Sequence, residues 1–376
     1  MFQTAAAIAQ QRLARIADAR RAVIEGEPLP LARAGIAPAD HDWIERSWRR
    51  CLALGLRPGQ RVAFDAVPAA ALRRIAEANH ALLAAARPVL HGLARAIARS
   101  HYFALLTDAD GVVIATEGAI DPHDRRSRVI ARVGVDLSER RIGTSAIGAA
   151  LAERRPVWLH RGEHFFDDTG CYSCAGAPLS GPGGDCIGML DLTGVDAVER
   201  PELRHLAAQA ARDIENALVR ALPARHRLRL NWPGHGLGGD GDGLLALDGD
   251  GGVLGANPAA REILPGLQPQ GLPAHAPVHL AELFAMPADT LLSLRDSSPM
   301  EVPLWSGLRV LVQPDADAGQ PSPVSLPAPG VPLKALETEL IQQAVARAHG
   351  NVMLAARALG VSRATVYRRL AAKKTR

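Results

Sequence analysis

Cysteine is scarce in this chain of 376 residues, and long apolar runs are missing. Four cysteines are too few for the disulfide framework of a secreted protein of this length. No apolar run approaches the roughly 18 residues that a membrane span needs. The stretch from Met1 to Gly26 lacks the compact apolar core and cleavage site of a secretory signal, and we interpret it as a surface or dimer helix. These absences predict a cytoplasmic protein without a membrane segment.

Motifs for catalysis and nucleotide binding are missing as well. The sequence contains no Gly-x-x-x-x-Gly-Lys-Ser/Thr phosphate-binding loop and no acidic magnesium-binding strand motif. It also shows no strong order of Cys, His and Asp of the kind that a cysteine-dependent enzyme requires. We therefore expect no enzymatic activity, no ATP hydrolysis and no bound cofactor.

Positive charge is concentrated at one end of the chain. The formal net charge is +4, but the segment from Leu340 to Arg376 contains eight Lys and Arg residues and no Asp or Glu. The formal charges of the preceding residues therefore sum to −4. A basic tail on a mildly acidic body indicates a polyanionic partner at the C-terminal end.

The length and the ordinary share of apolar residues predict a globular protein of two or three domains. We expect an α+β multidomain fold, in which a Pro-rich spacer separates the body from a final compact module. The predicted parts are a helical region over 1–75, a first sensor-type domain over 76–222, a second over 240–312, a linker over 313–332 and an all-α module over 333–376.

Local patterns place several elements within these parts. A helix over 42–51 is expected to end at Pro58-Gly59, and a helix over 82–98 to break or restart at Pro88. Short apolar runs predict three hairpins, with their turns at Asp108–Gly111, Gly181–Gly184 and Asp248–Gly251. The first and third share the pattern strand, Asp-x-Asp-Gly, strand, which suggests two sensor-type sheets in tandem.

The last 45 residues predict three short helices with helix-turn-helix spacing. Asn351 and Ser362 are suited to cap the second and third helices, and Gly360 permits the sharp connection between them. The exposed face of the third helix would present side chains that can reach base edges, and the basic residues after it suit phosphate contact. The predicted DNA-binding residues are Ser362, Arg363, Thr365, Tyr367, Arg368, Arg369, Lys373 and Lys374.

The run from Gly350 to Leu370, GNVMLAARALGVSRATVYRRL, closely resembles the Fis-type DNA-binding domain of bacterial enhancer-binding regulators. The resemblance places Arg363, Thr365, Tyr367 and Arg368 on the recognition helix. Tyr367 stands where Fis itself has a basic residue, which leaves the base preference open.

The region over about 45–220 resembles the N-terminal half of sigma-54 activators of the acetoin-catabolism regulator (AcoR) type. The matching motifs, in order, are ERSWRRC at 45–51, GTSAIG at 143–148, EHF at 163–165, CAGAP at 174–178, GMLDLTG at 188–194 and ARDIEN at 211–216. The resemblance implies a GAF-type sensor over 76–222 and, less directly, a PAS-like domain over 240–312. Activators of this type have a central AAA+ ATPase, and the roughly 20-residue linker leaves no room for one here.

Two candidate sites lie within the sensor region. Aromatic and polar side chains gather around the expected ligand cleft of a GAF fold, although each of them is at least as well explained as ordinary core. The predicted pocket residues are Trp158, His164, Phe165, Phe166, Tyr172 and Cys174. Cys171 and Cys174 form a Cys-x-x-Cys pair that could hold a metal or a redox disulfide, but no second matched pair is present, so pocket lining is the favoured interpretation.

These observations favour a homodimeric, sequence-specific regulator of transcription that binds double-stranded DNA and responds to a small-molecule effector. Two recognition helices would read half-sites about 34 Å apart. Without the ATPase, we expect no direct remodelling of the sigma-54 polymerase. The alternatives are a redox or metal sensor that uses Cys171 and Cys174 to control DNA binding, a cysteine-dependent enzyme, and a sequence-independent architectural DNA binder.

Overall fold

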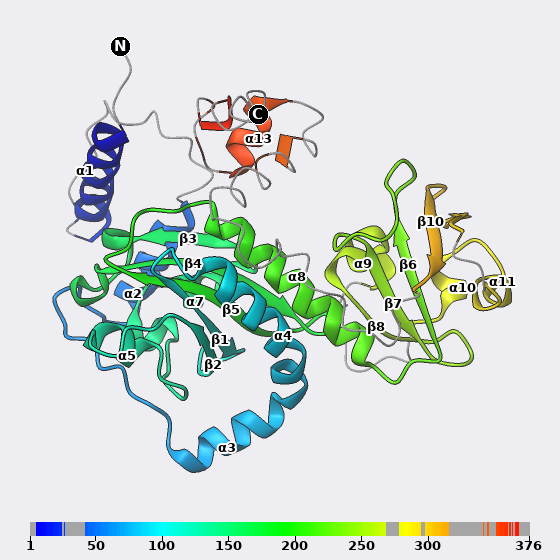
Figure 1. The fold of residues 1–376 in the computed structure, drawn as a ribbon, viewed down its shortest axis with the longest axis horizontal. Coiled ribbons are helices and arrows are strands. Elements are labelled where there is room, and N and C mark those ends of the chain that lie inside the picture. The colour runs from blue at the N-terminus through cyan, green and yellow to red at the C-terminus, as the bar shows by residue number, and fades with distance from the viewer. Residues whose placement is uncertain are drawn as a thin grey trace.

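Two antiparallel five-stranded sheets each form the centre of a domain in the protein, which we describe from a computed structural model. Figure 1 shows the two sheet domains side by side, joined by the long helix α8 (Leu203–Ala221). The structure describes residues 5–24, 26, 42–267, 278–294, 298–315, 341, 344–345, 351–359, 361, 363 and 365–367.

The first sheet domain is built on two long hairpins. Strands β1 (Tyr102–Asp108) and β2 (Val113–Gly118) form one, and β4 (Tyr172–Ser180) and β5 (Cys186–Val195) form the other, which confirms the predicted hairpins. With β3 (Val157–His160) the sheet order is β2-β1-β5-β4-β3. Every residue of β1 is buried, because helices or loops cover both faces of the sheet.

Helices α4 (His80–Ile97) and α8 cover one face of this sheet. The expected break at Pro88 is wrong, because α4 continues through that residue. Proline removes its own hydrogen bond to the carbonyl four residues earlier, Ala84 in this helix, and its ring crowds that carbonyl. Both residues are exposed, so water can solvate that carbonyl. Helix α3 (Ala69–Ala78) precedes α4, projects from the domain in Figure 1 and contains no buried residue.

Short elements and the N-terminal helices cover the opposite face, which we call the α7 face after helix α7 (Ala146–Glu153). They are α1 (Ala5–Ile24), α2 (Asp42–Ala53), α5 (Arg125–Ile130), α6 (Glu139–Ile142), η3 (Arg161–Glu163) and η4 (Asp167–Thr169). The expectation that Pro58-Gly59 ends α2 is wrong. The helix already ends at Ala53, because Gly55 adopts a φ of 79° and the Leu56 amide donates to the Cys51 carbonyl, a Schellman ending.

The second sheet domain contains β6 (His226–Asn231), β7 (Gly243–Leu247), β8 (Val253–Ala256), β9 (Met300–Pro303) and β10 (Arg309–Pro314), in the order β8-β7-β6-β10-β9. Its edge hairpin β7–β8 turns at the predicted Asp-Gly sequence. The central strand is β6, the first in the chain, whereas the central strand of the first sheet is its last, β5. Both sheets therefore consist of five antiparallel strands, but the chain passes through the strand positions in a different order.

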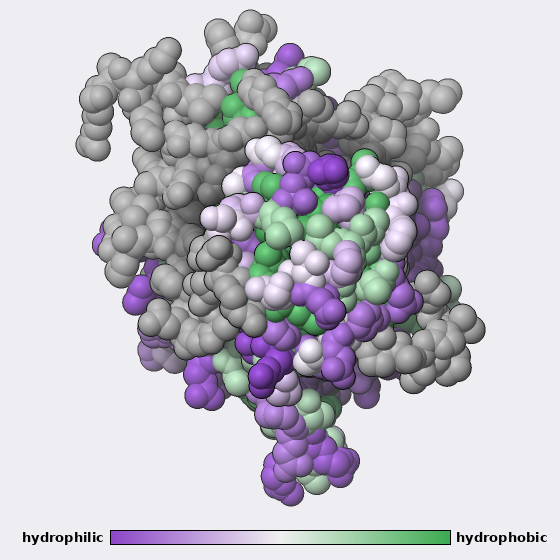
Figure 2. All heavy atoms as spheres, turned by 90° about the vertical axis from the view of Figure 1, so that its right-hand side faces the viewer, coloured by the Kyte–Doolittle hydropathy of each residue, from purple (hydrophilic) through white to green (hydrophobic). Residues whose placement is uncertain are grey.

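Helices cover one face of the second sheet. They are α9 (Pro258–Ile263), η5 (Pro265–Leu267), α10 (Leu280–Leu283) and α11 (Ala288–Leu292). Figure 2 looks at this domain and shows apolar residues gathered among polar ones on its surface. Trp305 and Leu308, in the β9–β10 turn, are more than half exposed.

The C-terminal region contains helix α13 (Val352–Leu359), which the sequence predicts. Ile341, Ala356, Leu359 and Val366 form a small buried cluster. Across the described residues, none of the helices combines the length and hydropathy needed to cross a bilayer.

Candidate functional sites

The end of the chain presents a polar face opposite its small core. Val366 is fully buried, whereas Arg363 and Tyr367 are exposed, as the helical spacing predicts. Arg363 and Tyr367 are four residues apart, so they lie on the same side of a helix. Thr365 is half-buried. The side chain of Asn351 accepts a hydrogen bond from the Met353 amide and caps α13, as expected.

These residues form an exposed face with an arginine and a tyrosine above an apolar core. A guanidinium and a phenol can both donate hydrogen bonds to bases or phosphates. The other predicted DNA-binding residues, Ser362, Arg368, Arg369, Lys373 and Lys374, lie outside the described residues.

The structure brings together five of the six residues predicted to line a sensor pocket. Phe165, Phe166, Tyr172 and Cys174 belong to the buried cluster on the α7 face, and the ring of His164 lies 6.5 Å from that of Tyr172. Trp158 belongs to the cluster on the opposite face of the sheet, because it alternates with Val157 and Leu159 along β3.

His164 is a buried imidazole with one free nitrogen. Its Nδ1 lies 2.9 Å from the Arg161 carbonyl, and its Nε2 has no hydrogen-bond partner. Burial lowers the pKa of His164 to about 4, so the ring is neutral near pH 7. Nδ1 then donates to the carbonyl, which leaves Nε2 as an unpaired acceptor.

The environment of the two paired cysteines disfavours reactive chemistry. Burial raises the pKa of the Cys171 thiol, and it raises that of Cys174 well above the usual value. The thiolate is the form that attacks disulfides and binds metals, so both thiols are poorly activated. Among the described residues, no group of three or more His, Cys, Asp or Glu side chains is arranged to hold a metal ion.

The ERSWRRC motif at 45–51 attaches α2 to the α7 face. Ser47 donates to Glu139 and lies 2.8 Å from the Thr144 hydroxyl, and Arg50 makes two hydrogen bonds to Glu139, at 3.0 and 3.1 Å. Arg46 and Arg50 both pair with Glu153 at the end of α7. The motif is visible in the sequence, but its partners are not, because they lie about 90–107 residues away.

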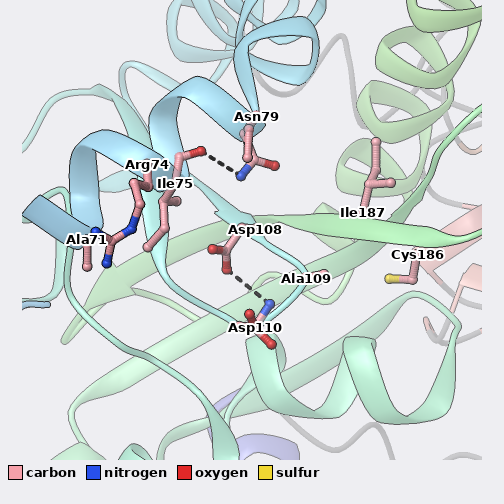
Figure 3. A pocket seen from close by; sticks show the side chains of 10 residues that line it. Ala71, Arg74, Ile75, Asn79, Asp108, Ala109, Asp110, Cys186 and Ile187 are labelled. Atoms are coloured by element: carbon pink, nitrogen blue, oxygen red, sulfur yellow. Dashed lines mark hydrogen bonds between the residues drawn. The ribbon is translucent and has the colours of Figure 1, made fainter.

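One hollow of the first domain lies away from these residues. A groove of about 500 Å³ runs between α3, the β1–β2 turn and the start of β5 (Figure 3). None of the predicted pocket residues lines it. Two of its polar side chains serve local structure, since Asp108 accepts from the amides of Asp110 and Val112, and Asn79 donates to the Ile75 carbonyl.

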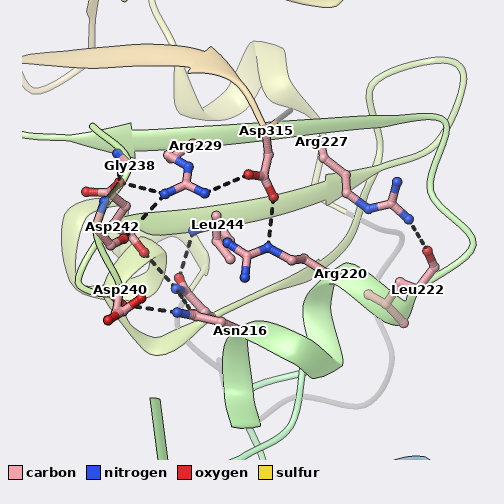
Figure 4. A network of polar contacts seen from close by, with 12 residues as sticks. Asn216, Arg220, Leu222, Arg227, Arg229, Gly238, Asp240, Asp242, Leu244 and Asp315 are labelled. Carbon is pink, nitrogen blue, oxygen red and sulfur yellow. Dashed lines mark hydrogen bonds and ion pairs between the residues drawn. The ribbon is translucent and has the colours of Figure 1, made fainter. Parts of the chain in front are cut away.

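A polar network fastens α8 to the second sheet domain (Figure 4). Arg229 on β6 is almost fully buried and pairs with Asp242 at 3.2 Å and Asp315 at 2.8 Å. Arg220 on α8 pairs with the other oxygen of Asp315, at 3.1 Å. Although burial opposes it, hydrogen bonding from Arg229 holds the pKa of Asp315 below its usual value.

The ARDIEN motif on α8 lies between the two domains. Glu215 accepts from the Ser180 amide at 2.7 Å, at the end of β4. Asn216 donates to the Asp240 carbonyl and accepts from Asn257 of the second domain. The turn between β4 and β5 also touches that domain, since the Pro182 carbonyl accepts from the Ala256 amide. A movement in the first domain can therefore reach the second through α8 and through the β4–β5 turn.

Two protein-family models match parts of the chain. Residues 35–216 match the MimR N-terminal domain, and residues 332–372 match the Fis family of bacterial regulatory proteins. The acetoin catabolism regulatory protein of Cupriavidus necator is 31% identical over 229 residues, which cover 59% of this chain and 34% of that protein. The propane 2-monooxygenase operon transcriptional activator MimR of Mycolicibacterium smegmatis is 30% identical over 217 residues, 55% of this chain and 35% of that protein.

The AcoR activator of the acetoin dehydrogenase operon in Bacillus subtilis is 29% identical over 47% of this chain and 29% of its own length. These three relatives are regulators of transcription, and the matches span about a third of their lengths. Among solved structures, the Escherichia coli DhaR(N)–DhaL complex gives a TM-score of 0.43 at 16% identity, over 72% of this chain and 97% of that chain.

Proposed function

Because this chain joins a MimR-type N-terminal domain to a Fis-family helix-turn-helix, and its relatives regulate transcription, we propose that it is a ligand-responsive, sequence-specific DNA-binding regulator. The observation that supports DNA binding most directly is the exposed pair Arg363 and Tyr367 above the buried Val366, within a segment of net charge +8. In this proposal the first sheet domain is a GAF-like sensor of a small molecule, and its effector site is on the α7 face.

The proposal includes a cytoplasmic homodimer with a PAS-like second domain. One helix-turn-helix reads only a few base pairs, and a two-fold pair would supply the remaining affinity and specificity. Helix α8 connects the sensor to the second domain through Asn216 and Arg220, so it is the natural route for an effector signal. In this proposal the Pro-rich stretch that follows Asp315 joins the second domain to the DNA-binding module.

The first test is fluorescence anisotropy of the full chain with the DNA upstream of its own gene. Scrambled DNA serves as competitor, at two salt concentrations. We expect tight, sequence-selective binding that weakens with salt, because basic side chains that contact phosphates release counterions. Equal affinity for scrambled DNA would contradict sequence-specific regulation and favour an architectural role.

Replacing Arg363 with alanine is expected to weaken binding to the preferred DNA by about tenfold to a hundredfold, which corresponds to the 1–3 kcal/mol of a lost base contact. The matched control is Arg309→Ala, which removes one positive charge from an exposed side chain of the second domain. The same anisotropy titrations measure the selectivity of the variant. If Arg363→Ala still prefers the upstream DNA as strongly as the native protein does, Arg363 does not contact the bases.

We also propose that the chain regulates without ATPase activity and without direct remodelling of the sigma-54 polymerase. The supporting observation is that no phosphate-binding loop motif occurs between the sensor and the helix-turn-helix. Purified protein is expected to release no inorganic phosphate from ATP above the buffer rate, with or without target DNA, in a coupled phosphate assay. An ATPase activity that elutes together with the protein in gel filtration would overturn this expectation.

A further inference from the structure

Helix α3 has an apolar side that the rest of the domain does not bury. The helix has ten residues, none of them buried, and an isolated helix of this length is marginal in water. Ala71, Ile75 and Ala78 share one side of it and line the groove of about 500 Å³ between α3, the β1–β2 turn and the start of β5, which we call the α3 groove. Ile187 of β5 continues this apolar lining. A ligand with an apolar body would remove these side chains from water and hold α3 against the domain.

Charged side chains of both signs border the apolar lining. Figure 3 shows Arg74 on α3 at one side of the groove, and Asp108 and Asp110 of the β1–β2 turn at the other. Arg74 and Asp110 are exposed, and neither forms an ion pair within the described part of the chain. The α3 groove therefore offers a cation and two carboxylates that do not neutralise one another.

The carboxyl of Asp108 has few partners for its degree of burial. Asp108 is only 6% exposed, and its Oδ1 accepts hydrogen bonds from the amides of Asp110 and Val112, at 3.0 and 2.9 Å. Within the described residues, only backbone amides donate to this carboxyl and no cation pairs with it, and burial raises its pKa. A cation bound in the groove would stabilise the carboxylate, because a buried charge is costly unless it is paired.

We propose that the α3 groove binds a small zwitterion with an apolar side chain, of the class of amino acids and dipeptides. The ammonium of the ligand pairs with Asp108 and Asp110, its carboxylate pairs with Arg74, and its side chain covers Ile75 and Ile187. The volume of the groove lies within the range of small-molecule sites.

This site is separate from the proposed effector site and does not depend on it. The two isoleucines of the groove, Ile75 and Ile187, pack against the buried cluster beneath α4 and α8, on the opposite side of the sheet from the α7 face. The inference goes beyond the proposed function, since the chain can bind a zwitterion here whether or not it binds DNA. A failure of either proposal therefore leaves the other standing.

Isothermal titration calorimetry of the full chain tests the ligand class with matched probes. The probes are L-leucine, L-leucyl-L-leucine, L-leucinamide, which has no carboxylate, and N-acetyl-L-leucine, which has no ammonium. At about pH 6.5, where the amino groups are protonated, we expect at least one zwitterion to bind about tenfold or more tightly than either singly charged probe, because each of these loses an ion pair. A singly charged probe that binds as well as both zwitterions, or no binding of any probe at millimolar concentration, would overturn the proposal.

Two neighbouring arginines of α3 provide a matched pair of variants. Arg74→Gln removes the charge that lines the groove, and it should abolish the preference for leucine over leucinamide. Arg73→Gln removes the same charge from an exposed side chain that does not line the groove, and it should leave the preference unchanged. If the two variants weaken binding equally, the ligand responds to net charge alone and the assigned site is wrong.

The carboxylates are tested in the same titrations. Asp108→Asn keeps the Oδ1 acceptor that the turn uses but removes the charge, and it should weaken binding of the zwitterion about tenfold or more. Asp110→Asn changes an exposed side chain, so it gives the same test if Asp108→Asn fails to fold. Unchanged affinity in both variants would remove the ammonium from this end of the groove.

The free cysteines report where the ligand binds. Cys186 lines the α3 groove and is partly exposed, whereas Cys171 is partly exposed but lies away from it. With the zwitterion at about ten times its Kd, alkylation of Cys186 by iodoacetamide should slow about tenfold, because only the unoccupied fraction reacts. Alkylation of Cys171 should not change. Mass spectrometry of the two cysteine-containing peptides measures both rates, and equal protection of the two cysteines, or protection of neither, would contradict binding in the α3 groove.

Discussion

Replacing Arg229 with methionine is expected to lower the free energy of unfolding of the second sheet domain by about 3 kcal/mol. The guanidinium is only 4% exposed and is the partner of two carboxylates that are themselves almost completely buried. Its removal leaves Asp242 with amide and Asn231 donors but no cation among its described contacts. Asp315 keeps Arg220, which holds the expected loss at the lower end of the range for a broken buried pair.

The matched control is Arg309→Met on the neighbouring strand β10. Arg309 and Glu301 are 3.5 Å apart and at least half exposed, so losing this pair should cost less than about 1 kcal/mol. Urea unfolding followed by circular dichroism measures both variants. Adding Asp242→Asn to Arg229→Met removes the unpaired charge and should recover part of the loss. If Arg229→Met is as mild as the control, the buried network does not stabilise the domain.

Elements that depend on neighbouring residues can be predicted from the sequence. The hairpin over β1 and β2 follows from two short apolar runs around Asp108–Gly111, in which Gly111 adopts a φ of 86° that other residues rarely accept. The exposed Tyr367 and the buried Val366 follow in the same way from helical periodicity. In both places the side chains that determine the structure lie within one turn or one hairpin.

Features that depend on distant partners could not be predicted. The sequence shows Pro88 but not that the solvent-facing side of α4 tolerates it. It shows the arginines of ERSWRRC but not Glu139 and Glu153, to which they bind. It shows the Asp108–Gly111 turn but not that α3 lies beside this turn and forms a groove with it.

The predicted sensor pocket also depends on contacts between distant residues, which the sequence does not reveal. The sequence predicts that Trp158 lines one pocket with Phe165 and Tyr172, which lie close to it along the chain. Alternation along β3 instead directs Trp158 to the opposite face of the sheet. Residues of separate motifs become neighbours through the antiparallel pairing of β4 and β5, which aligns Cys174 with Thr193. Strand register, which motif spacing does not reveal, therefore determines which side chains share a site.

Replacing Trp48 with alanine is expected to destabilise the first sheet domain by about 3–5 kcal/mol, because it removes the largest fully buried side chain and leaves a cavity. Trp48 belongs to α2, yet its indole donates a hydrogen bond to the Glu163 carbonyl at 2.9 Å, at the base of the segment that contains His164 and Phe165. The control Leu54→Ala removes a side chain that is 53% exposed just after the same helix and should cost less than about 1 kcal/mol.

Chemical denaturation followed by circular dichroism measures both changes, and limited proteolysis of the folded variants reports where the structure opens. We expect Trp48→Ala to expose cleavage sites within 161–171 as well as in α2, since the helix and that segment share the tryptophan. The family match beginning at residue 35 includes α2, and this coupled opening would make α2 an integral part of the sensor rather than a separate helical region. Cleavage confined to residues before 60, with a small loss of stability, would instead mean that α2 only rests on a domain that folds without it.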